Sequence, residues 1–197
     1  MISISLKNYL IIWLILTGVI EIKSQVQDSS DLNKVKSSWF ISVNSGVQMS
    51  GIKDEDFVGS NYSPLLKATF GKWISPLFAF QIGYKGFYFN YIEDDVKHQY
   101  NYFYGETLFN LNNAVQPNRE NKNWNLLLHA GAGYFQNKSF NKSQLGLNIG
   151  VQNNYQLSDL IIANIDIASI IGWKIYQGDE DILPGITVGF SYIFIFE

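Results

Sequence analysis

The chain of 197 residues combines few charges with many aromatic side chains. Charged residues make up 16% of the sequence, against roughly 25% in an average soluble domain, and aromatic residues also make up 16%. The formal net charge of −3 gives no basic surface of the kind that binds nucleic acid, so no nucleic-acid partner is expected. The absence of cysteine excludes disulfides, thiolate metal sites, thiol catalysis and acylation at cysteine.

Residues 1–24 have the pattern of a cleaved export signal. Lys7 supplies the positive start, residues 9–20 form a short apolar core, and the small Ser24 precedes the expected cleavage point. A transmembrane anchor is the competing interpretation, but the apolar run is shorter than the ~20 residues that a helix needs to cross a bilayer. We expect residues 25–37 to form a short periplasmic segment and residues 38–197 to form the folded domain.

From Trp39 onward, apolar and polar residues alternate with a period of two, which indicates β-strands with two different faces. The cleanest alternation covers residues 39–48, 78–85, 145–152 and 186–196. Noisier alternation covers residues 66–73, 100–111, 124–135 and 161–171. The sequence therefore predicts an all-β chain of eight strands.

The connections between these strands alternate in length. The links around residues 74–76 and 153–159 are short, whereas the polar or charged loops cover residues 51–64, 91–98, 137–142 and 177–184. Short periplasmic turns and long outer loops are typical of bacterial outer-membrane barrels. One link, residues 112–123, is long where a short turn is expected. The pattern predicts an eight-stranded antiparallel up-and-down transmembrane β-barrel, with both barrel ends of the chain in the periplasm.

A soluble eight-stranded barrel is the alternative, since it also alternates. It would turn its apolar face inward and a charged face outward. Here the polar face is rich in Gly, Ser, Thr, Asn and Gln and carries only isolated charges such as Lys85, Glu106 and Asp166. Small neutral residues suit the crowded lumen of a narrow barrel better than a water-facing surface. The composition of the two faces thus favours a membrane barrel with a packed polar lumen.

The last strand resembles the C-terminal assembly signal of outer-membrane proteins. A polar residue is followed by a glycine and then by two aromatic residues at alternate positions, here Thr187, Gly189, Tyr192 and Phe194. Such a regular strand can be paired by an insertion machinery through its edge. The resemblance implies that the barrel assembly machinery is a transient partner. Phe196 and Glu197 follow the signal.

Three segments resemble the outer membrane protein A-like family of eight-stranded, porin-type barrels. They are KATFGKWISPLFAFQIGYKG at 67–86, GETLFNLNN at 105–113 and WNLLLHAGAGY at 124–134. The resemblance implies a bacterial outer-membrane location and contact with outer-membrane lipids and lipopolysaccharide. Many relatives add a C-terminal peptidoglycan-binding domain, which this sequence does not carry, so a cell-wall anchoring role is not implied.

Five ionisable residues fall on faces that we expect to point into the lumen. A charge inside a narrow barrel has to be paired or hydrogen-bonded, because an unpaired one costs several kcal/mol. We therefore expect a structural polar network that includes a bridge between Lys85 and Glu106 on neighbouring strands; an ion path is the alternative. The five residues are Lys67, Lys85, Glu106, His129 and Asp166.

Other candidate sites are weaker. Four tryptophans near strand ends fit aromatic girdles at the membrane interfaces: Trp39, Trp73, Trp124 and Trp173. The acidic segments 53–56, 93–95 and 179–181 fit solvated loops, with a divalent-cation bridge to lipopolysaccharide as the alternative. No residue spacing indicates a catalytic, cofactor or metal site, so no cofactor is expected.

The functional hypothesis from sequence is a non-enzymatic outer-membrane barrel with a role in envelope integrity or surface interaction. An accessory of an outer-membrane assembly or secretion system is the alternative, with an unidentified surface or envelope protein as partner. A lipid-modifying enzyme is the third hypothesis. It would need a nucleophile, a base and a carboxylate together on the barrel rim. No serine lies at a spacing from His98 that indicates such a pair, and His129 is expected in mid-strand, facing the lumen.

Overall fold

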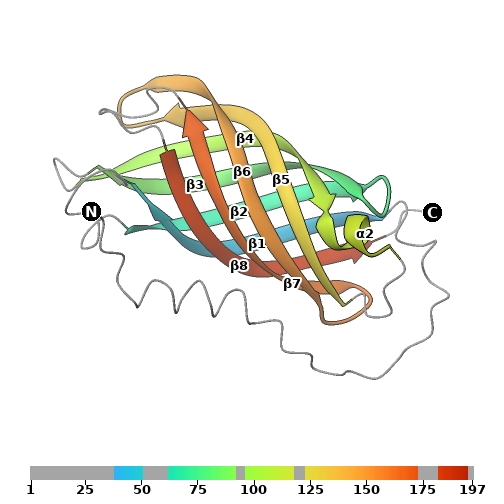
Figure 1. The fold of residues 1–197 in the computed structure, drawn as a ribbon. Coiled ribbons are helices and arrows are strands. Elements are labelled where there is room, and N and C mark those ends of the chain that lie inside the picture. The colour runs from blue at the N-terminus through green and yellow to red at the C-terminus, as the bar shows by residue number, and fades with distance from the viewer. Residues whose placement is uncertain (1–37, 51–61, 92–95, 118–122, 173–181, 195–197) are drawn as a thin grey trace, which may run out of the picture.

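A computed structural model of the chain describes residues 38–50, 62–91, 96–117, 123–172 and 182–194 (Figure 1). The expected export signal, the expected periplasmic segment 25–37, Trp173 and Phe196 lie outside the described residues. The elements are β1 (Trp39–Met49), β2 (Tyr62–Trp73), β3 (Phe78–Tyr91), β4 (Val96–Asn110), α2 (Leu111–Val115), β5 (Trp124–Asn137), β6 (Lys142–Gln156), β7 (Ile161–Gly172) and β8 (Ile182–Phe194).

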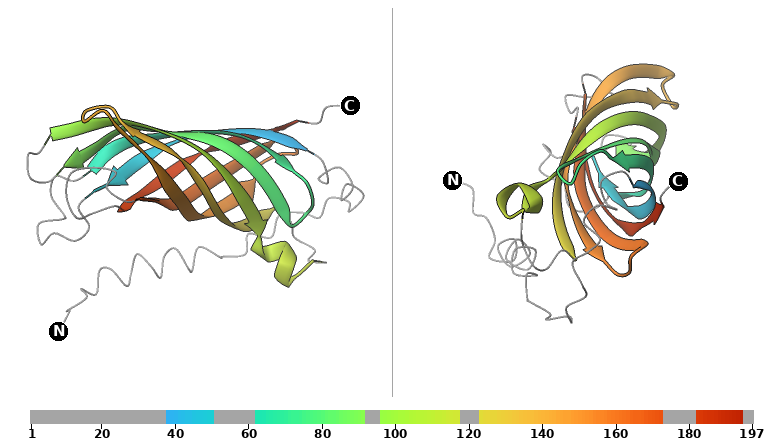
Figure 2. Two further views of the ribbon diagram at one scale, coloured as in Figure 1. Left: turned by 90° about the horizontal axis from the view of Figure 1, so that it is seen from above. Right: turned by 90° about the vertical axis from the view of Figure 1, so that its right-hand side faces the viewer.

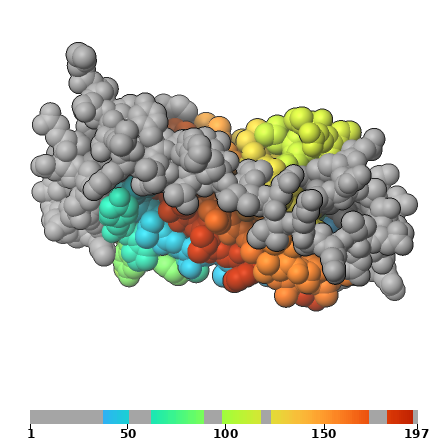
Figure 3. Space-filling model, turned by 60° about the horizontal axis from the view of Figure 1, so that its bottom comes forward, coloured from blue at the N-terminus to red at the C-terminus, as the bar shows by residue number. Residues whose placement is uncertain are grey.

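The strands form one closed barrel in which each pairs with its neighbours in sequence and β8 pairs with β1. All eight pairings are antiparallel. At the closing seam Trp39 lies opposite Phe194, and Figure 3 shows β1 in blue beside β8 in red on the outer surface. The predicted fold class, an eight-stranded antiparallel up-and-down barrel, is confirmed. The first residue of β1 and the last residue of β8 therefore lie at the same end.

The strands are longer than the sequence pattern predicted. Residues 62–64 belong to β2, β3 continues to Tyr91, and β6 covers Lys142–Gln156. Of these, residues 62–64, Tyr91, Lys142 and residues 153–156 were expected to lie in loops. At both ends of β6, polar residues such as Ser143 and Asn153 also occur on the outward face, so the alternation fades there although the backbone pairing continues.

The long link after β4 contains the short helix α2, which the sequence reading missed. Strand β4 ends at Asn110 and not at Leu111, because the Asn110 side chain accepts a hydrogen bond from the backbone N–H of Asn113 (3.1 Å) and caps the helix. The Asn113 side chain also donates to the backbone oxygen of Pro76 (2.9 Å). These bonds tie α2 to the rim, where it projects beside the barrel wall (Figure 2). No helix in the described part of the chain has the length and apolarity needed to cross a membrane.

The two faces of the barrel wall have opposite character. Apolar side chains point outward and are exposed, as with Ile82 (66%) and Phe190 (61%). Polar side chains point inward and are buried, as with Lys67 (1%) and Asn44 (2%). This arrangement is the reverse of that in a water-soluble protein, in which apolar residues fill the interior.

Apolar clusters fill the lumen on either side of a polar middle. One cluster lies at the end where β1 begins: Phe40, Ala79, Leu108 and Leu127, with Trp73 packed against it. The other lies toward the opposite end: Tyr100, Tyr102, Tyr104, Phe135, Ile170 and Leu183. Trp73 was expected in the outer aromatic girdle, but it packs against the inward cluster, with its ring centroid 6.5 Å from that of Phe40. The reason is parity: Trp73 shares the inward face of β2 with Lys67 and Thr69.

Candidate functional site

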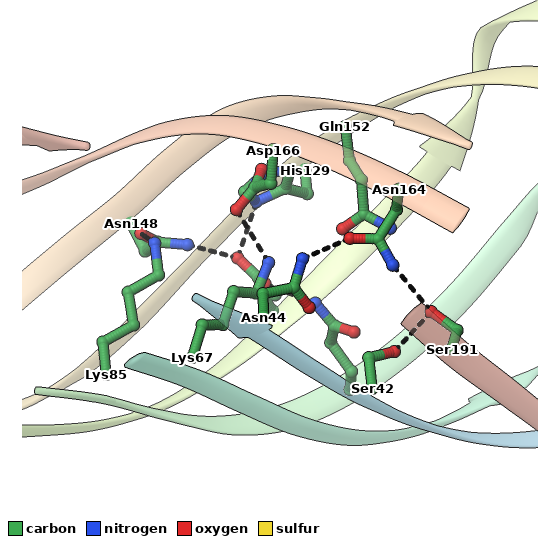
Figure 4. Close-up of polar contacts among 12 residues, drawn as sticks. Ser42, Asn44, Lys67, Lys85, His129, Asn148, Gln152, Asn164, Asp166 and Ser191 are labelled. Carbon is green, nitrogen blue, oxygen red and sulfur yellow. Dashed lines mark hydrogen bonds and ion pairs between the residues drawn. The ribbon is translucent and has the colours of Figure 1, made fainter. Parts of the chain in front are cut away.

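The centre of the lumen is organised around His129, which lies between two carboxylates (Figure 4). Its Nδ1 is 2.8 Å from Oε2 of Glu106, and its Nε2 is 2.8 Å from Oδ1 of Asp166. The three side chains come from β5, β4 and β7, and all are buried. Strand β4 is adjacent to β5, but β6 separates β5 from β7. The His129 imidazole therefore links two strands, β4 and β7, that are not paired with each other.

The contacts of His129 indicate the protonation state of its ring. Ionised carboxylates only accept hydrogen bonds, so both contacts are satisfied when each ring nitrogen carries a proton. A charged imidazole between two carboxylates makes two charge-assisted hydrogen bonds. These bonds hold Glu106 and Asp166 together although both are acidic.

The remaining carboxylate oxygens also have donors. Lys67 donates from Nζ to Oδ2 of Asp166 (2.9 Å), and both side chains are almost fully buried. The Gln81 amide donates to Oε1 of Glu106, and the Asn148 amide donates to its Oε2. All four carboxylate oxygens in the lumen therefore accept at least one hydrogen bond. This is the condition under which buried charges are tolerated.

Lys85 does not form the predicted bridge to Glu106. The register of β3 and β4 places Gln81 opposite Glu106 and places Lys85 opposite Tyr102. The Lys85 ammonium instead donates to Oδ1 of Asn148 (2.7 Å), whose amide reaches Glu106. It also lies 5.6 Å from the ring centroid of Tyr104. Lys85 is thus linked to the acidic centre through an amide and not through an ion pair.

A separate chain of neutral side chains crosses the closing seam. The Asn44 amide donates to Oδ1 of Asn164, and the Asn164 amide donates to Oγ of Ser191 (3.1 Å). Ser191 Oγ is 2.6 Å from Oγ of Ser42. These bonds join β1, β7 and β8 from inside the barrel (Figure 4). Alternation puts these four residues on the polar face, but no sequence pattern assigns them to a site.

Two glycines make room for the acidic centre. A Cβ atom at Gly150 would lie 2.6 Å from Nε2 of His129 and 2.5 Å from Cβ of Ala168. A Cβ atom at Gly131 would lie 2.4 Å from Cβ of Glu106 and 2.0 Å from the backbone oxygen of Gly105. All four contacts are far inside van der Waals distance. The absence of a side chain at these positions therefore allows the charged groups to pack against the wall.

Three tyrosines in the lumen were missed from the sequence. Tyr100, Tyr102 and Tyr104 point inward; Tyr102 donates to the backbone oxygen of Gly146 (2.9 Å), and Tyr100 donates to Gln48. The sequence signal was available, because all three share the parity of Glu106 on the same strand. It was overlooked because aromatic residues were expected to face lipid.

The other predicted sites lie along the wall. Thr187 is buried on the inward face of β8, Gly189 shares that face, and Tyr192 is exposed on the outer face (48%). Phe194 lies near Phe70, with ring centroids 6.2 Å apart. Among the tryptophans, Trp39 stacks on Phe70, and Trp124 donates from Nε1 to Asn153 (2.6 Å).

The chemistry of the lumen is that of a structural network. Both nitrogens of His129 contact carboxylates, so neither is left to activate a hydroxyl group. Among the residues that the structure describes, no group of three or more His, Cys, Asp or Glu side chains is placed to hold a metal ion. The hydrogen bonds and ion pairs of the lumen therefore link strands of the wall to one another from inside the barrel.

Comparison with solved structures gives matches that cover almost the whole of each matched chain. The N-terminal β-barrel domain of Pseudomonas aeruginosa OprF is 12% identical and superposes with a TM-score of 0.54, covering 81% of this chain and 98% of that one. The chain has the fold of the small outer-membrane barrels. Neisserial surface protein A is 10% identical, with a TM-score of 0.53 and coverage of 80% and 97%. No protein-family model matches the sequence, and no curated protein matches it.

Proposed function

We propose that the protein is a non-enzymatic β-barrel of the bacterial outer membrane that contributes to envelope integrity and presents its loops for surface interaction. The observation that carries the proposal is the reversed distribution of polarity. Large apolar side chains such as Ile82 and Phe190 are exposed, whereas Lys67 and Asp166 are buried. In a closed barrel every strand is paired along both edges, so the backbone N–H and C=O groups are hydrogen-bonded. The hydrocarbon core of a membrane requires this.

The packed lumen supports a structural role over transport. Apolar clusters lie on both sides of the charged centre, and one of them contains the buried rings of Tyr100, Tyr102 and Phe135. An eight-stranded barrel leaves an interior that side chains fill. An ion would have to displace these rings and then break the bonds around His129.

The expected partners follow from the same surface. Its apolar outer face fits lipid chains, and its loops would lie among lipopolysaccharide on the cell surface. The strand β8 presents Tyr192 and Phe190 on its outer face. This regular face agrees with recognition of β8 by the barrel assembly machinery during insertion.

The test is heat-modifiability combined with membrane fractionation. We expect the native chain to be recovered with outer membranes and to migrate differently on a denaturing gel before and after boiling, because the barrel resists detergent until it is heated. Identical migration together with recovery in the soluble fraction would overturn the proposal. In planar bilayers the folded protein should give no steady open conductance. A large, lasting conductance would refute the packed lumen while leaving the membrane location intact.

A further inference from the structure

One charged side chain interrupts the apolar outer face of the barrel. Lys72 has the outward parity of Phe70 on β2, whereas Lys67, Lys85, Glu106 and Asp166 point inward. Among outward-facing strand residues whose side chains the structure describes, Lys72 is the one that carries a charge. A lysine in this position needs an anion or water within reach of its ammonium group.

Aromatic rings surround this lysine. The strand register places Lys72 between Trp39 on β1 and Phe80 on β3. Its Nζ lies 4.9 Å from the centroid of the Trp39 ring. Trp39 in turn stacks on Phe70, with centroids 5.1 Å apart. The ammonium group is therefore held over an indole ring that is itself fixed by a neighbouring ring.

The depth of Lys72 fits the edge of the membrane. It is the last residue but one of β2, directly before the tight turn that leads to β3. On the orientation proposed above, this end of the barrel faces the periplasm. Lysine is tolerated near the interface, because its ammonium group can reach the headgroups. Trp39 at the same level is the residue type that favours this depth.

We propose that Lys72 and Trp39 form a binding site for the phosphate of an anionic phospholipid in the periplasmic leaflet; this inference rests on the proposed outer-membrane location. No ion pair joins Lys72 to a carboxylate of the described residues, including Asp159 on the β6–β7 turn at the same rim. The chain has a formal net charge of −3. A preference for anionic lipid would therefore come from a local site and not from overall attraction.

The experiment compares lipid retention by the full chain and two lysine variants. Each protein is inserted into vesicles of phosphatidylcholine and phosphatidylglycerol in equal amounts, extracted into mild detergent, and analysed by native mass spectrometry for the two lipids. The test variant is Lys72→Met, which keeps the aliphatic stem. The matched control is Lys142→Met, which removes an exposed lysine at the other end of the barrel.

We expect the wild type and Lys142→Met to retain phosphatidylglycerol in preference to phosphatidylcholine by about fivefold. This is the gain in affinity that one lysine provides near an anionic surface. Lys72→Met should show no preference. Trp39→Leu should weaken it, because the ring no longer orients the ammonium group. Equal preference in the wild type and Lys72→Met would overturn the site.

Folding is monitored in the same samples so that the two proposals fail separately. If the wild type is heat-modifiable in the vesicles but retains both lipids equally, the lipid site is refuted and the membrane barrel stands. If the wild type does not insert, the proposed function itself fails. Raising the ionic strength should reduce the preference for phosphatidylglycerol, because salt screens a charge at the interface.

Discussion

Two adjacent residues of β7 show the two environments that this barrel has to satisfy. Ile165 points outward and is 49% exposed, whereas Asp166 points inward and is 2% exposed. The backbone positions are equivalent, yet one residue must suit an apolar surrounding and the next must be fully hydrogen-bonded. In the proposed membrane location, the stability of the wall therefore depends on contact with lipid on one side and on complete hydrogen bonding of polar groups on the other.

The two faces differ in how strictly they restrict the residue at each position. Apolar contacts, such as those with lipid in the proposed location, are not directional, so the outer face can accept Ile, Val, Leu and Phe in many combinations. The lumen centre is directional, because the four carboxylate oxygens of Glu106 and Asp166 each receive particular donors. Conservative changes should therefore be mild outside and costly inside, whereas a new charge should be costly outside.

The largest effect is expected from Asp166→Asn. The change removes the charge that compensates both Lys67 and His129 while keeping the size of the side chain. Breaking a buried ion pair by neutralising one partner costs about 3–5 kcal/mol. We expect the free energy of unfolding in lipid vesicles, measured by urea titration with tryptophan fluorescence, to fall by this amount.

Asp159→Asn is the matched control for this change. Asp159 is exposed on the turn between β6 and β7, so the same substitution there should change stability by less than about 0.5 kcal/mol. If both variants lose the same stability, the network around His129 contributes nothing to the fold.

A somewhat smaller loss is expected from Ile165→Lys. A lysine on the lipid-facing side near the middle of the membrane costs about 2–4 kcal/mol. Ile165→Ala should cost clearly less, because it shortens an exposed apolar side chain without adding a charge. Unfolding in vesicles measures both variants. A lysine tolerated as well as an alanine would mean that this face does not contact lipid.

The smallest effect is expected from Lys85→Met. Among the described residues, Lys85 makes one hydrogen bond, to Asn148, and contacts no carboxylate directly. Its removal therefore leaves Glu106 with all of its donors. Replacing a buried charge by an apolar side chain of similar length can be neutral or stabilising. We expect a change within about 1 kcal/mol in the same unfolding experiment. Lys67→Met should be clearly more destabilising, because it removes a donor from Asp166; a larger loss for Lys85→Met would reverse our ranking of the two lysines.

Much of the wall could be predicted from the sequence because alternation is a local property. Each of the eight strands was located, and the inward parity of Glu106, His129 and Asp166 follows from their position relative to apolar neighbours such as Leu128 and Ile165. The strand ends were less certain, since the hydrophobic signal fades there. The helix α2 was missed although Asn110, a favoured N-cap residue, directly precedes it.

The hydrogen-bond and ion-pair partners of the lumen side chains could not be predicted from the sequence. They depend on the register in which all eight strands pair around the closed barrel. The expected bridge between Lys85 and Glu106 assumed that adjacent strands bring these side chains together. The observed pair joins Lys67 on β2 to Asp166 on β7, which are distant in the strand order. The curvature of the wall brings them across the lumen, and no local pattern contains that information.

The sequence by itself therefore determined which side chains face inward and which face outward, because a strand turns alternate residues to opposite sides. Only the tertiary structure decided which inward residues meet. The closed barrel places His129 between two carboxylates, packs Trp73 against Phe40, and places Lys72 beside Trp39. Strand register and curvature set these contacts, and both belong to the closed sheet and not to any single strand.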